Sequence, residues 1–200
     1  MTNQQNATGA TSANINHIPF ETDAGVAHRA AIGLIVLSTD QTIEHEFRFI
    51  FKQQGVAYYE SRIPNSNRIT PETLKEMEKL IEDQTDVILP GLPLDVVAFG
   101  CTSASMVIGE EMVFTKIRKK RPDAACTTPI TAAFAAFDAL DAKRIGVLTP
   151  YRQDINDFMR DYIAERGYEV PIFGSFNEEN DNIAARISAA SIHRAITRVA

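Results

Sequence analysis

Three short, largely apolar runs, each followed by polar or small residues, limit the possible folds of this chain most strongly. They are Ala31–Leu37, Asp95–Phe99 and Arg144–Leu148. Runs of this length are typical of strands that are buried on both faces of a parallel sheet. Segments with helical apolar spacing follow each run, so strands and helices alternate along the chain. The sequence therefore predicts an α/β fold with mostly parallel sheets flanked by helices.

The segments between these runs carry ordinary helix start and stop signals. Thr70 and Pro71 suit the N-cap and the first position of a helix. Gly55 and Gly167 follow helical patterns as C-caps, and Pro122 stops another helix. We expect helices over 44–54, from Pro71 through Ile81, over 104–121, from Pro129 through Leu140, over 154–166 and over 180–199, and further strands over 56–63 and 168–173.

The strands fall into two groups along the chain. Residues 28–125 hold three clear strands and are expected to form a first α/β lobe. Residues 126–200 hold two and are expected to form a second, similar lobe. To match the first lobe, the second needs one more strand and a covering helix, about 30 residues, so we expect it to be truncated. Residues 1–27 are expected to form a disordered tail.

The charge balance and the motif content exclude several function classes. The chain has 20 basic and 26 acidic residues and a net charge of −6. Phosphate binding needs a concentrated basic surface, so we expect no nucleic-acid partner. The sequence contains no Gly-x-Gly-x-x-Gly, no GxxxxGK[ST] and no metal-ligand spacing of Cys or His. We therefore expect neither a bound nucleotide nor a metal.

The apolar runs, the N-terminal residues and the cysteine content indicate where the protein is located and whether it has disulfides. The apolar runs are too short to span a bilayer, and Met1–Asn14 lacks the pattern of a signal peptide. Two cysteines, Cys101 and Cys126, do not make a disulfide framework. We expect a cytoplasmic protein with no membrane partner. The sequence leaves open whether it forms a homo-oligomer.

Cys101 is the first candidate for chemistry. A predicted buried strand delivers it to the start of a helix, with Gly100 before it to let the backbone turn. Free N–H groups and the helix dipole favour anions at such a place. We therefore expect a thiol pKa below about 8.5 and a cradle for a carboxylate or an enolate oxygen. Thr102 and Ser103 add hydroxyl donors. The alternative is a buried cysteine that packs as a small hydrophobe, and position alone does not decide between the two.

The other candidates lie on loops at the same predicted sheet edge, since ligands bind beyond the carboxyl ends of parallel strands. Tyr151 is placed to hydrogen-bond a carboxylate or to donate a proton, although a loop aromatic without a chemical role fits equally well. Asp40 and Asn182 are more often helix caps than ligands, and packing explains Cys126 better than catalysis does. The substrate-binding candidates are Ser38, Asp40, Thr102, Ser103, Thr149, Tyr151 and Asn182, with Cys101 as the catalytic candidate.

Four segments together resemble one enzyme group. Val96–Ser103 resembles the first cysteine motif of the Asp/Glu racemase superfamily. Ile145–Tyr151 resembles the strand and Thr-Pro-Tyr segment of its maleate isomerase and arylmalonate decarboxylase branch. Ile32–Ser38 resembles the first strand of that branch, and Asp181–Ala184 its asparagine-bearing loop. Over residues 30 to 200 the chain is most similar to the racemase-like proteins of ectoine utilisation.

The resemblance implies two similar lobes that face each other across a cleft, and cofactor-independent chemistry next to the carboxylate of a small acid. Cys101 matches the first cysteine of the family, a base in the racemases and a nucleophile on the double bond in the maleate isomerases. Thr102 and Ser103 match the carboxylate cradle. Tyr151 matches the active-site tyrosine of the branch, and Asn182 matches its second-lobe asparagine.

Two departures from the family pattern bear on the reaction. The isomerases of this branch usually carry Asn where this chain has Asp40, and a carboxylate there repels an anionic substrate unless it is protonated or paired. The second cysteine motif of the family belongs beyond Ala200, and Cys126 does not match it. We therefore expect an isomerase or racemase-like enzyme of a small acid or amino-acid derivative, in ectoine breakdown. Two alternatives stay open: a decarboxylase or C–C lyase, and a carboxylate-binding protein without catalysis.

Overall fold

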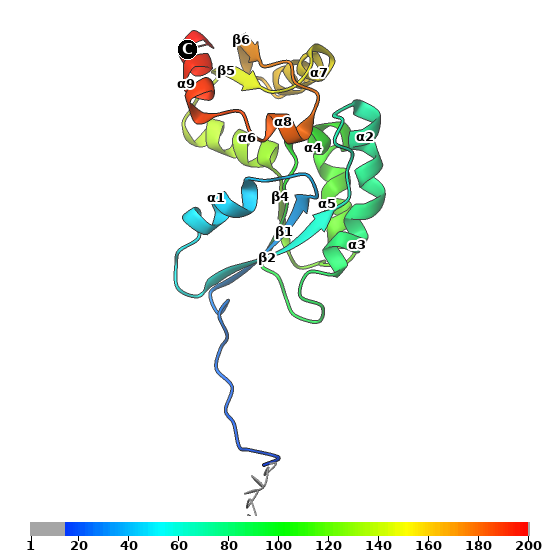
Figure 1. Cartoon of the computed structure of the whole chain (residues 1–200), viewed down its shortest axis with the longest axis vertical. Coiled ribbons are helices and arrows are strands. Elements are labelled where there is room, and N and C mark those ends of the chain that lie inside the picture. Colours follow the sequence, from blue (N-terminus) through cyan, green and yellow to red (C-terminus); the bar gives the residue numbers. More distant parts are fainter. Residues whose placement is uncertain (1–14, 200) are drawn as a thin grey trace, which may run out of the picture.

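The computed structural model describes residues 15–199 and shows two sheets, one above the other (Figure 1). The larger sheet has the strand order β2-β1-β3-β4, and every pair in it is parallel. The smaller sheet pairs β5 with β6, also in parallel. The expected α/β fold is therefore confirmed. The strands are β1 (Ala30–Leu37), β2 (Val56–Ile63), β3 (Val96–Phe99), β4 (Ala125–Thr127), β5 (Arg144–Thr149) and β6 (Glu169–Ser175).

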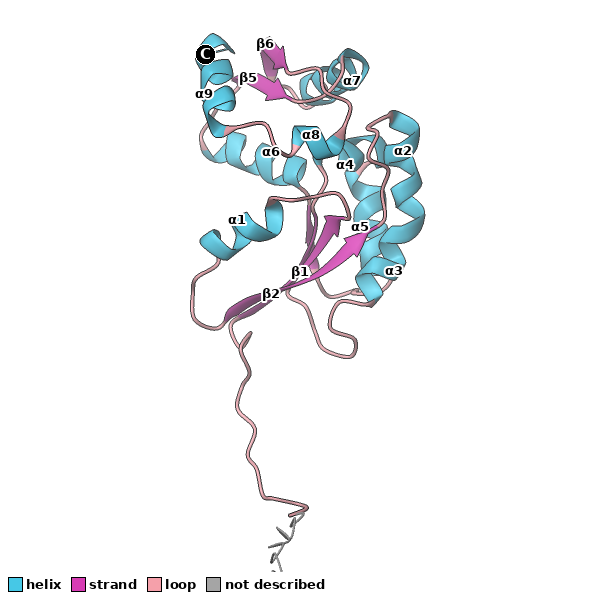
Figure 2. Ribbon diagram, viewed as in Figure 1, coloured by secondary structure: helices cyan, strands magenta, loops and turns pink. Residues whose placement is uncertain are grey.

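The core of the larger sheet lies around β1, because that strand has a partner on each side. Leu34, Ile35 and Val36 of β1 are fully buried. One face of the sheet is covered by several helices, and the opposite face is covered by α1 (Figure 2). The covering elements are α2 (Pro71–Glu76), the 3-10 helix η1 (Met77–Leu80), α3 (Ile81–Asp86) and α5 (Glu110–Arg118) on one face, and α1 (Ile43–Ile50) on the other.

A second core surrounds the smaller sheet. It contains Met106, Ile130, Phe134 and Met159. Met106 belongs to α4, which follows β3, so this one helix contributes to both halves of the molecule. The boundary that the sequence suggests between residues 125 and 126 falls within β4. The remaining helices are α4 (Thr102–Ile108), α6 (Pro129–Ala139), α7 (Gln153–Ala164), α8 (Asp181–Ala184) and α9 (Ala189–Val199).

A partly buried carboxylate joins α5 to the helices of the second core. Glu110 accepts hydrogen bonds from the hydroxyl groups of Thr131 on α6 and Tyr162 on α7. It also forms an ion pair with Arg166 at 2.6 Å, and the Arg166 guanidinium lies 4.9 Å from the centre of the Phe134 ring. Because all its acceptor positions face donors, Glu110 can be buried without an unpaired charge.

Two expected helices end earlier than the sequence suggests. The helix expected over 104–121 is broken at Gly109, which has φ +93° and ψ 128° and separates α4 from α5. The helix expected over 44–54 stops at Ile50, and Phe51 leaves the helical conformation with ψ 82°. The Phe51 ring instead packs against Phe47 at 5.0 Å. Gly55, with φ +81°, therefore belongs to the turn before β2 and is not a C-cap.

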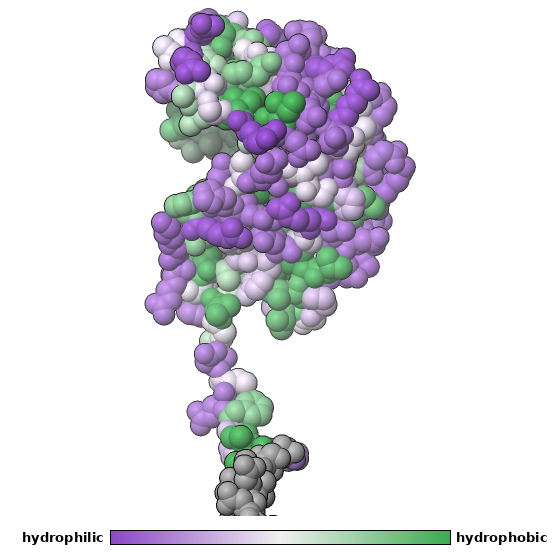
Figure 3. Space-filling model, viewed as in Figure 1, coloured by the Kyte–Doolittle hydropathy of each residue, from purple (hydrophilic) through white to green (hydrophobic). Residues whose placement is uncertain are grey.

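The last predicted helix, over 180–199, is two helices. The hydroxyl of Ser188 accepts from the Ser191 amide at 3.2 Å and starts α9 separately from α8. Three isoleucines of these two helices are about half exposed: Ile183 by 46%, Ile192 by 40% and Ile196 by 50%. Figure 3 shows apolar surface gathered on this upper part of the molecule.

The expected tail over residues 1–27 lies partly outside the described residues, which begin at Ile15. Residues 15–29 contain no helix and no strand. Between residues 15 and 199, none of the helices is long and apolar enough to cross a bilayer.

We expect Gly109→Ala to lower the free energy of unfolding by about 1–3 kcal/mol, because a side chain is strained at that backbone conformation. The position has open space around it, so the loss would report backbone strain and not a clash. Urea unfolding measures the change. Thr115→Ala, an exposed position on α5, is the matched control and should change stability by no more than about 0.5 kcal/mol. Equal stability of Gly109→Ala and this control would contradict the interpretation.

Candidate active site

Cys101 is held where β3 ends. The Gly100 amide donates to the carbonyl of Ile35 at 2.8 Å, and this bond keeps the chain beside β1 up to that point. A Cβ on Gly100 would lie 3.1 Å from that carbonyl oxygen and 3.0 Å from Ile43 Cδ1. Glycine is therefore needed for close packing, and not for the turn that the sequence suggested. Cys101, 6% exposed, is the N-cap residue of α4.

The first turn of α4 surrounds the thiol with donors. The Cys101 Sγ lies 3.8 Å from the Ser103 Oγ. The Ala104 amide, in the same first turn, acts to lower the pKa of the thiol. On the other side of the residue, the Cys101 carbonyl accepts from the Ser105 amide at 3.1 Å and from its hydroxyl at 2.5 Å. The position of the sulfur is thus fixed by the helix start.

A small, largely enclosed cavity of about 40 Å³ lies against the thiol. Ser103 from α4, Tyr151 from the loop after β5 and Asp181 from α8 line it together with Cys101. These side chains come from both halves of the molecule, since α4 and α8 meet between the two sheets (Figure 1). The remaining lining residues are Leu37, Asn65, Ser66, Arg68, Ile69, Thr73, Leu74 and Met77.

The segment 179–182 brings Asp181 to this cavity by docking onto the loop after β2. Asn180 forms an antiparallel bridge with Arg68. On either side of it, the Ile69 amide donates to the Glu179 carbonyl at 3.1 Å, and the Asp181 amide donates to the Asn67 carbonyl at 2.9 Å. The backbone of the second half therefore continues the edge of the first half next to Cys101.

Side chains strengthen the same docking. The Thr39 hydroxyl donates to the Asp181 carboxylate. Arg152, in the loop before α7, forms an ion pair with Glu179 at 2.8 Å, and Arg68 approaches the same carboxylate at 3.7 Å. The cavity is closed by these contacts.

Burial has the largest effect on the pKa of the Cys101 thiol. It raises the pKa of Cys101 to about 11, although the Ala104 amide and the Ser103 hydroxyl act in the opposite direction. The charges of Asp181 and Asp40 raise the pKa further. The prediction of a lowered pKa was therefore wrong: desolvation outweighs the start of the helix. In this closed arrangement the sulfur carries its proton at neutral pH.

Tyr151 is also kept neutral. Burial raises the pKa of its phenol, and the charges of Cys101 and Asp181 add to the effect, while a hydrogen bond with Ser103 opposes it. The backbone of Tyr151 is fixed, since its carbonyl accepts from the Asn156 side chain at 2.8 Å. The phenol and the thiol therefore face the same cavity as two neutral donors.

The other predicted residues lie around the cavity and not in its wall. Ser38 donates to Asn65 at 2.8 Å. Asp40 accepts from the amides of Thr42 and Ile43, both at 2.8 Å, and so caps α1. Thr149 is buried and donates to Asn156 at 2.6 Å.

Thr102, Asn182 and Cys126 also lie outside the cavity wall. Thr102 lines a separate groove that faces the smaller sheet. Asn182 is exposed and accepts from Gln41 at 3.2 Å. Cys126 is half-buried on β4. Of the predicted site, the cavity brings together Cys101, Ser103 and Tyr151.

Sequence reasoning missed five polar residues of the cavity wall: Asn65, Ser66, Arg68, Thr73 and Asp181. Asn65 and Arg68 follow β2, and the loop after β2 ends at the same sheet edge as the loops that were considered. Asp181 directly precedes Asn182 in a segment that was singled out for its asparagine. The strand order therefore indicates that Asn65 and Arg68 lie at this edge of the sheet. The position of Asp181 depends instead on contacts between the two halves of the molecule.

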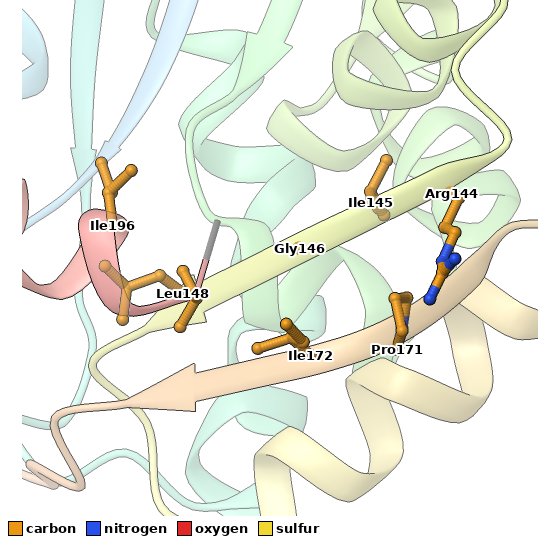
Figure 4. A pocket seen from close by; sticks show the side chains of 8 residues that line it. Arg144, Ile145, Gly146, Leu148, Pro171, Ile172 and Ile196 are labelled. Atoms are coloured by element: carbon orange, nitrogen blue, oxygen red, sulfur yellow. The ribbon is translucent and has the colours of Figure 1, made fainter.

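A larger groove of about 720 Å³ lies on the smaller sheet, away from the thiol (Figure 4). Leu148 and Ile172 line it from β5 and β6, and Ile196 borders it from α9. Within residues 15–199, Arg144 is the one charged residue among those that line this groove. It offers no nucleophile or acid–base group. The described part of the chain also holds no cluster of three or more His, Cys, Asp or Glu that could bind a metal ion.

Comparison with known proteins identifies the family. The profile of the arylmalonate decarboxylase family matches residues 32–200. The chain belongs to this family. The match covers every element that forms the Cys101 cavity, from β1 to α8.

Known relatives and solved structures agree with this placement. The chain is 28% identical to the maleate isomerase of Pseudomonas putida over 166 residues, which is 76% of this chain and 65% of the relative. It is 27% identical to that of Alcaligenes faecalis over 152 residues, 70% of this chain and 60% of the relative. The chain thus spans less than two thirds of the length of either enzyme.

Among solved structures, a mutant of Nocardia farcinica maleate cis-trans isomerase with a covalently bound succinylcysteine intermediate has a TM-score of 0.76 at 20% identity. It covers 86% of this chain and 73% of its own. A liganded mutant of arylmalonate decarboxylase has a TM-score of 0.73 at 21% identity, with 85% and 72% covered. The fold is therefore that of the Asp/Glu racemase superfamily.

We expect alkylation of Cys101 by iodoacetamide to rise about tenfold per pH unit from pH 7 to about pH 9.5 without a plateau, because only the thiolate reacts. In the urea-unfolded chain the rate should level off near the ordinary thiol pKa of about 8.5. Peptide mass spectrometry separates Cys101 from Cys126. A plateau below about pH 8.5 at Cys101 in the folded protein would contradict the raised pKa.

Proposed function

We propose that this protein is a cofactor-independent enzyme, an isomerase or racemase-like catalyst, that acts on the carbon next to the carboxylate of a small acid. The observation that carries the proposal is the enclosed cavity at the carboxyl end of β3, where Cys101, Ser103 and Tyr151 face one another. Membership of the arylmalonate decarboxylase family supports it. The maleate isomerase relatives favour isomerisation within that class.

Cys101 is the reacting group in this proposal. As a base, its thiolate removes the proton next to the carboxylate, and the electron pair moves into the carboxylate to give an enediolate. The Ser103 hydroxyl and the amide groups at the start of α4 stabilise the new negative charge. Return of the proton from the Cys101 thiol to the same face would restore the starting isomer, so inversion needs a second donor, and the Tyr151 hydroxyl faces the same cavity. Because a catalytic base works best with a pKa near the operating pH, Cys101 must first lose its proton when the substrate binds.

As a nucleophile, the same thiolate adds to one carbon of a double bond conjugated to the carboxylate. The electron pair moves toward the carboxylate, the former double bond rotates, and expulsion of the thiolate re-forms it as the other geometric isomer. The covalent succinylcysteine in the Nocardia farcinica isomerase supports this route. Tyr151 orients the carboxylate, and Asn182 could act on substrate only if the contact with Gln41 opens.

Decarboxylation is the second candidate, favoured by the neutral thiol of the closed site. Loss of one carboxylate of a malonate as carbon dioxide leaves the electron pair conjugated with the remaining carboxylate as an enediolate, and the Cys101 thiol supplies the proton to the carbon and is reprotonated from water. Carbon dioxide release separates this reaction from isomerisation, which in deuterium oxide would exchange the proton or change only the double-bond geometry. A role in ectoine breakdown stays a prediction from the resemblance of the sequence.

We expect Cys101→Ala to lower turnover at least about 100-fold, because both routes need the sulfur. The assay offers maleate, phenylmalonate and a panel of small amino acids in deuterium oxide, and follows products by proton NMR. Cys126→Ser is the matched control, since Cys126 lies outside the cavity, and should retain wild-type turnover. Full turnover by Cys101→Ala would overturn the assignment. Binding without any turnover by the wild type would support a carboxylate-binding protein instead.

A further inference from the structure

The wall of the Cys101 cavity carries a negative charge that the proposed chemistry does not use. Asp181 lines the cavity with Cys101 and Tyr151, and Arg68, the one cation among the described lining residues, is paired with Glu179 at 3.7 Å. Its carboxylate accepts from the Thr39 hydroxyl, which is a neutral donor. Within residues 15–199, the ion pairs beside it join Arg68 and Arg152 to Glu179, and neither includes Asp181.

A second carboxylate acts from the loop after β1. One oxygen of Asp40 is occupied by the amides that begin α1. The nearby Arg62 donates to the carbonyls of Ser38 and Asp40 and forms an ion pair with Glu44, so its charge is directed at a different carboxylate. The charges of Asp40 and Asp181 both act on the Cys101 sulfur.

These charges select among small acids. A substrate carboxylate can be held by the Ser103 hydroxyl and the amides of α4, because these groups are donors. A second carboxylate on the same molecule would be placed near Asp181 in a cavity with little solvent, where like charges repel strongly. An ammonium group at that place would instead pair with the Asp181 carboxylate. The cavity, about 40 Å³, admits only a few heavy atoms beside the sulfur.

We propose that the substrate carries a cationic amino group beside its carboxylate, and that Asp181 binds that group. The substrate class is then an amino acid or an amino-acid derivative with a free amine, and not a dicarboxylate. Asp181 is a specificity-determining residue in this proposal. The proposal rests on the proposed function, since it places the substrate against Cys101.

The charge at the thiol can be measured without any substrate. Two methanethiosulfonate reagents with the same two-carbon linker, one ending in an ammonium group and one in a sulfonate, each transfer a thioalkyl group to the thiolate and release methanesulfinate. After division by the rates with free cysteine, we expect Cys101 to react at least about tenfold faster with the cationic reagent. Asp181→Asn should reduce this ratio severalfold, since asparagine can still accept from Thr39. Asp123→Asn, an exposed position before β4, is the matched control with the same change in net charge and should leave the ratio unchanged.

A matched ligand pair tests the substrate class. 2-Aminobutanoate and butanoate share a carbon skeleton and differ in the amine, and each is titrated as a protectant of Cys101 against iodoacetamide. In the wild type we expect half-protection by 2-aminobutanoate at a concentration at least about tenfold lower than by butanoate or succinate. Asp181→Asn should abolish the difference.

The outcomes separate this proposal from the proposed function. Equal protection by the three acids, protection by none of them, or a reagent ratio at Cys101 equal to that of free cysteine would overturn the role of Asp181. These results would not change the expected loss of turnover in Cys101→Ala. Retained turnover in Cys101→Ala would overturn the proposed function, whatever the charge preference. The preference for the amine together with its loss in Asp181→Asn is the supporting result.

Discussion

The hydrogen bond from the Gly100 amide to the Ile35 carbonyl fixes the place at which the chain leaves the larger sheet. It is possible because β1 and β3 run parallel and because a residue without a side chain approaches β1 closely at this point. Cys101 follows directly and starts α4, so the residue that carries the sulfur is attached to a buried strand of the sheet. α4 then carries Met106 into the second core. One short stretch of backbone therefore relates the thiol to both halves of the molecule.

Two opposing effects act on the thiol, and the structure shows which one is larger. The helix start supplies donors that favour the thiolate, as the sequence suggested. Burial removes water from the sulfur, and two carboxylates add repulsion. Because a helix terminus contributes about 0.3–1 kcal/mol, or about 2 in favourable sites, it does not offset full desolvation. The thiol is thus protonated in the closed state.

The sequence predicted five of the six strands that the structure shows within residues 15–199, because most of them are apolar runs with breakers on both sides, and it missed the three-residue β4. It was wrong about the burial of β5, since Arg144 and Gly146 are exposed. It also failed at two helix ends: Phe51 leaves the helical conformation with its ring beside Phe47 and Tyr58, and Gly109 interrupts a segment whose apolar spacing continues on either side. The position of Cys101 beside Tyr151 follows from the shared edge of parallel strands, and so could be predicted. The presence of Asp181 in the cavity wall could not, because it results from docking of the segment 179–182 onto the loop after β2.

That docking links closure of the cavity to the charge on the sulfur. The bridge between Arg68 and Asn180 closes the cavity and brings the Asp181 carboxylate next to Cys101 at the same time. This closed arrangement therefore favours the protonated thiol. An ammonium group paired with Asp181 would neutralise the charge of that carboxylate and so stabilise the Cys101 thiolate. By linkage, formation of the thiolate would in turn strengthen binding of the ammonium group. A dicarboxylate would act in the opposite direction and keep the proton on the sulfur. Selection of the substrate and activation of the thiol would then depend on the same carboxylate.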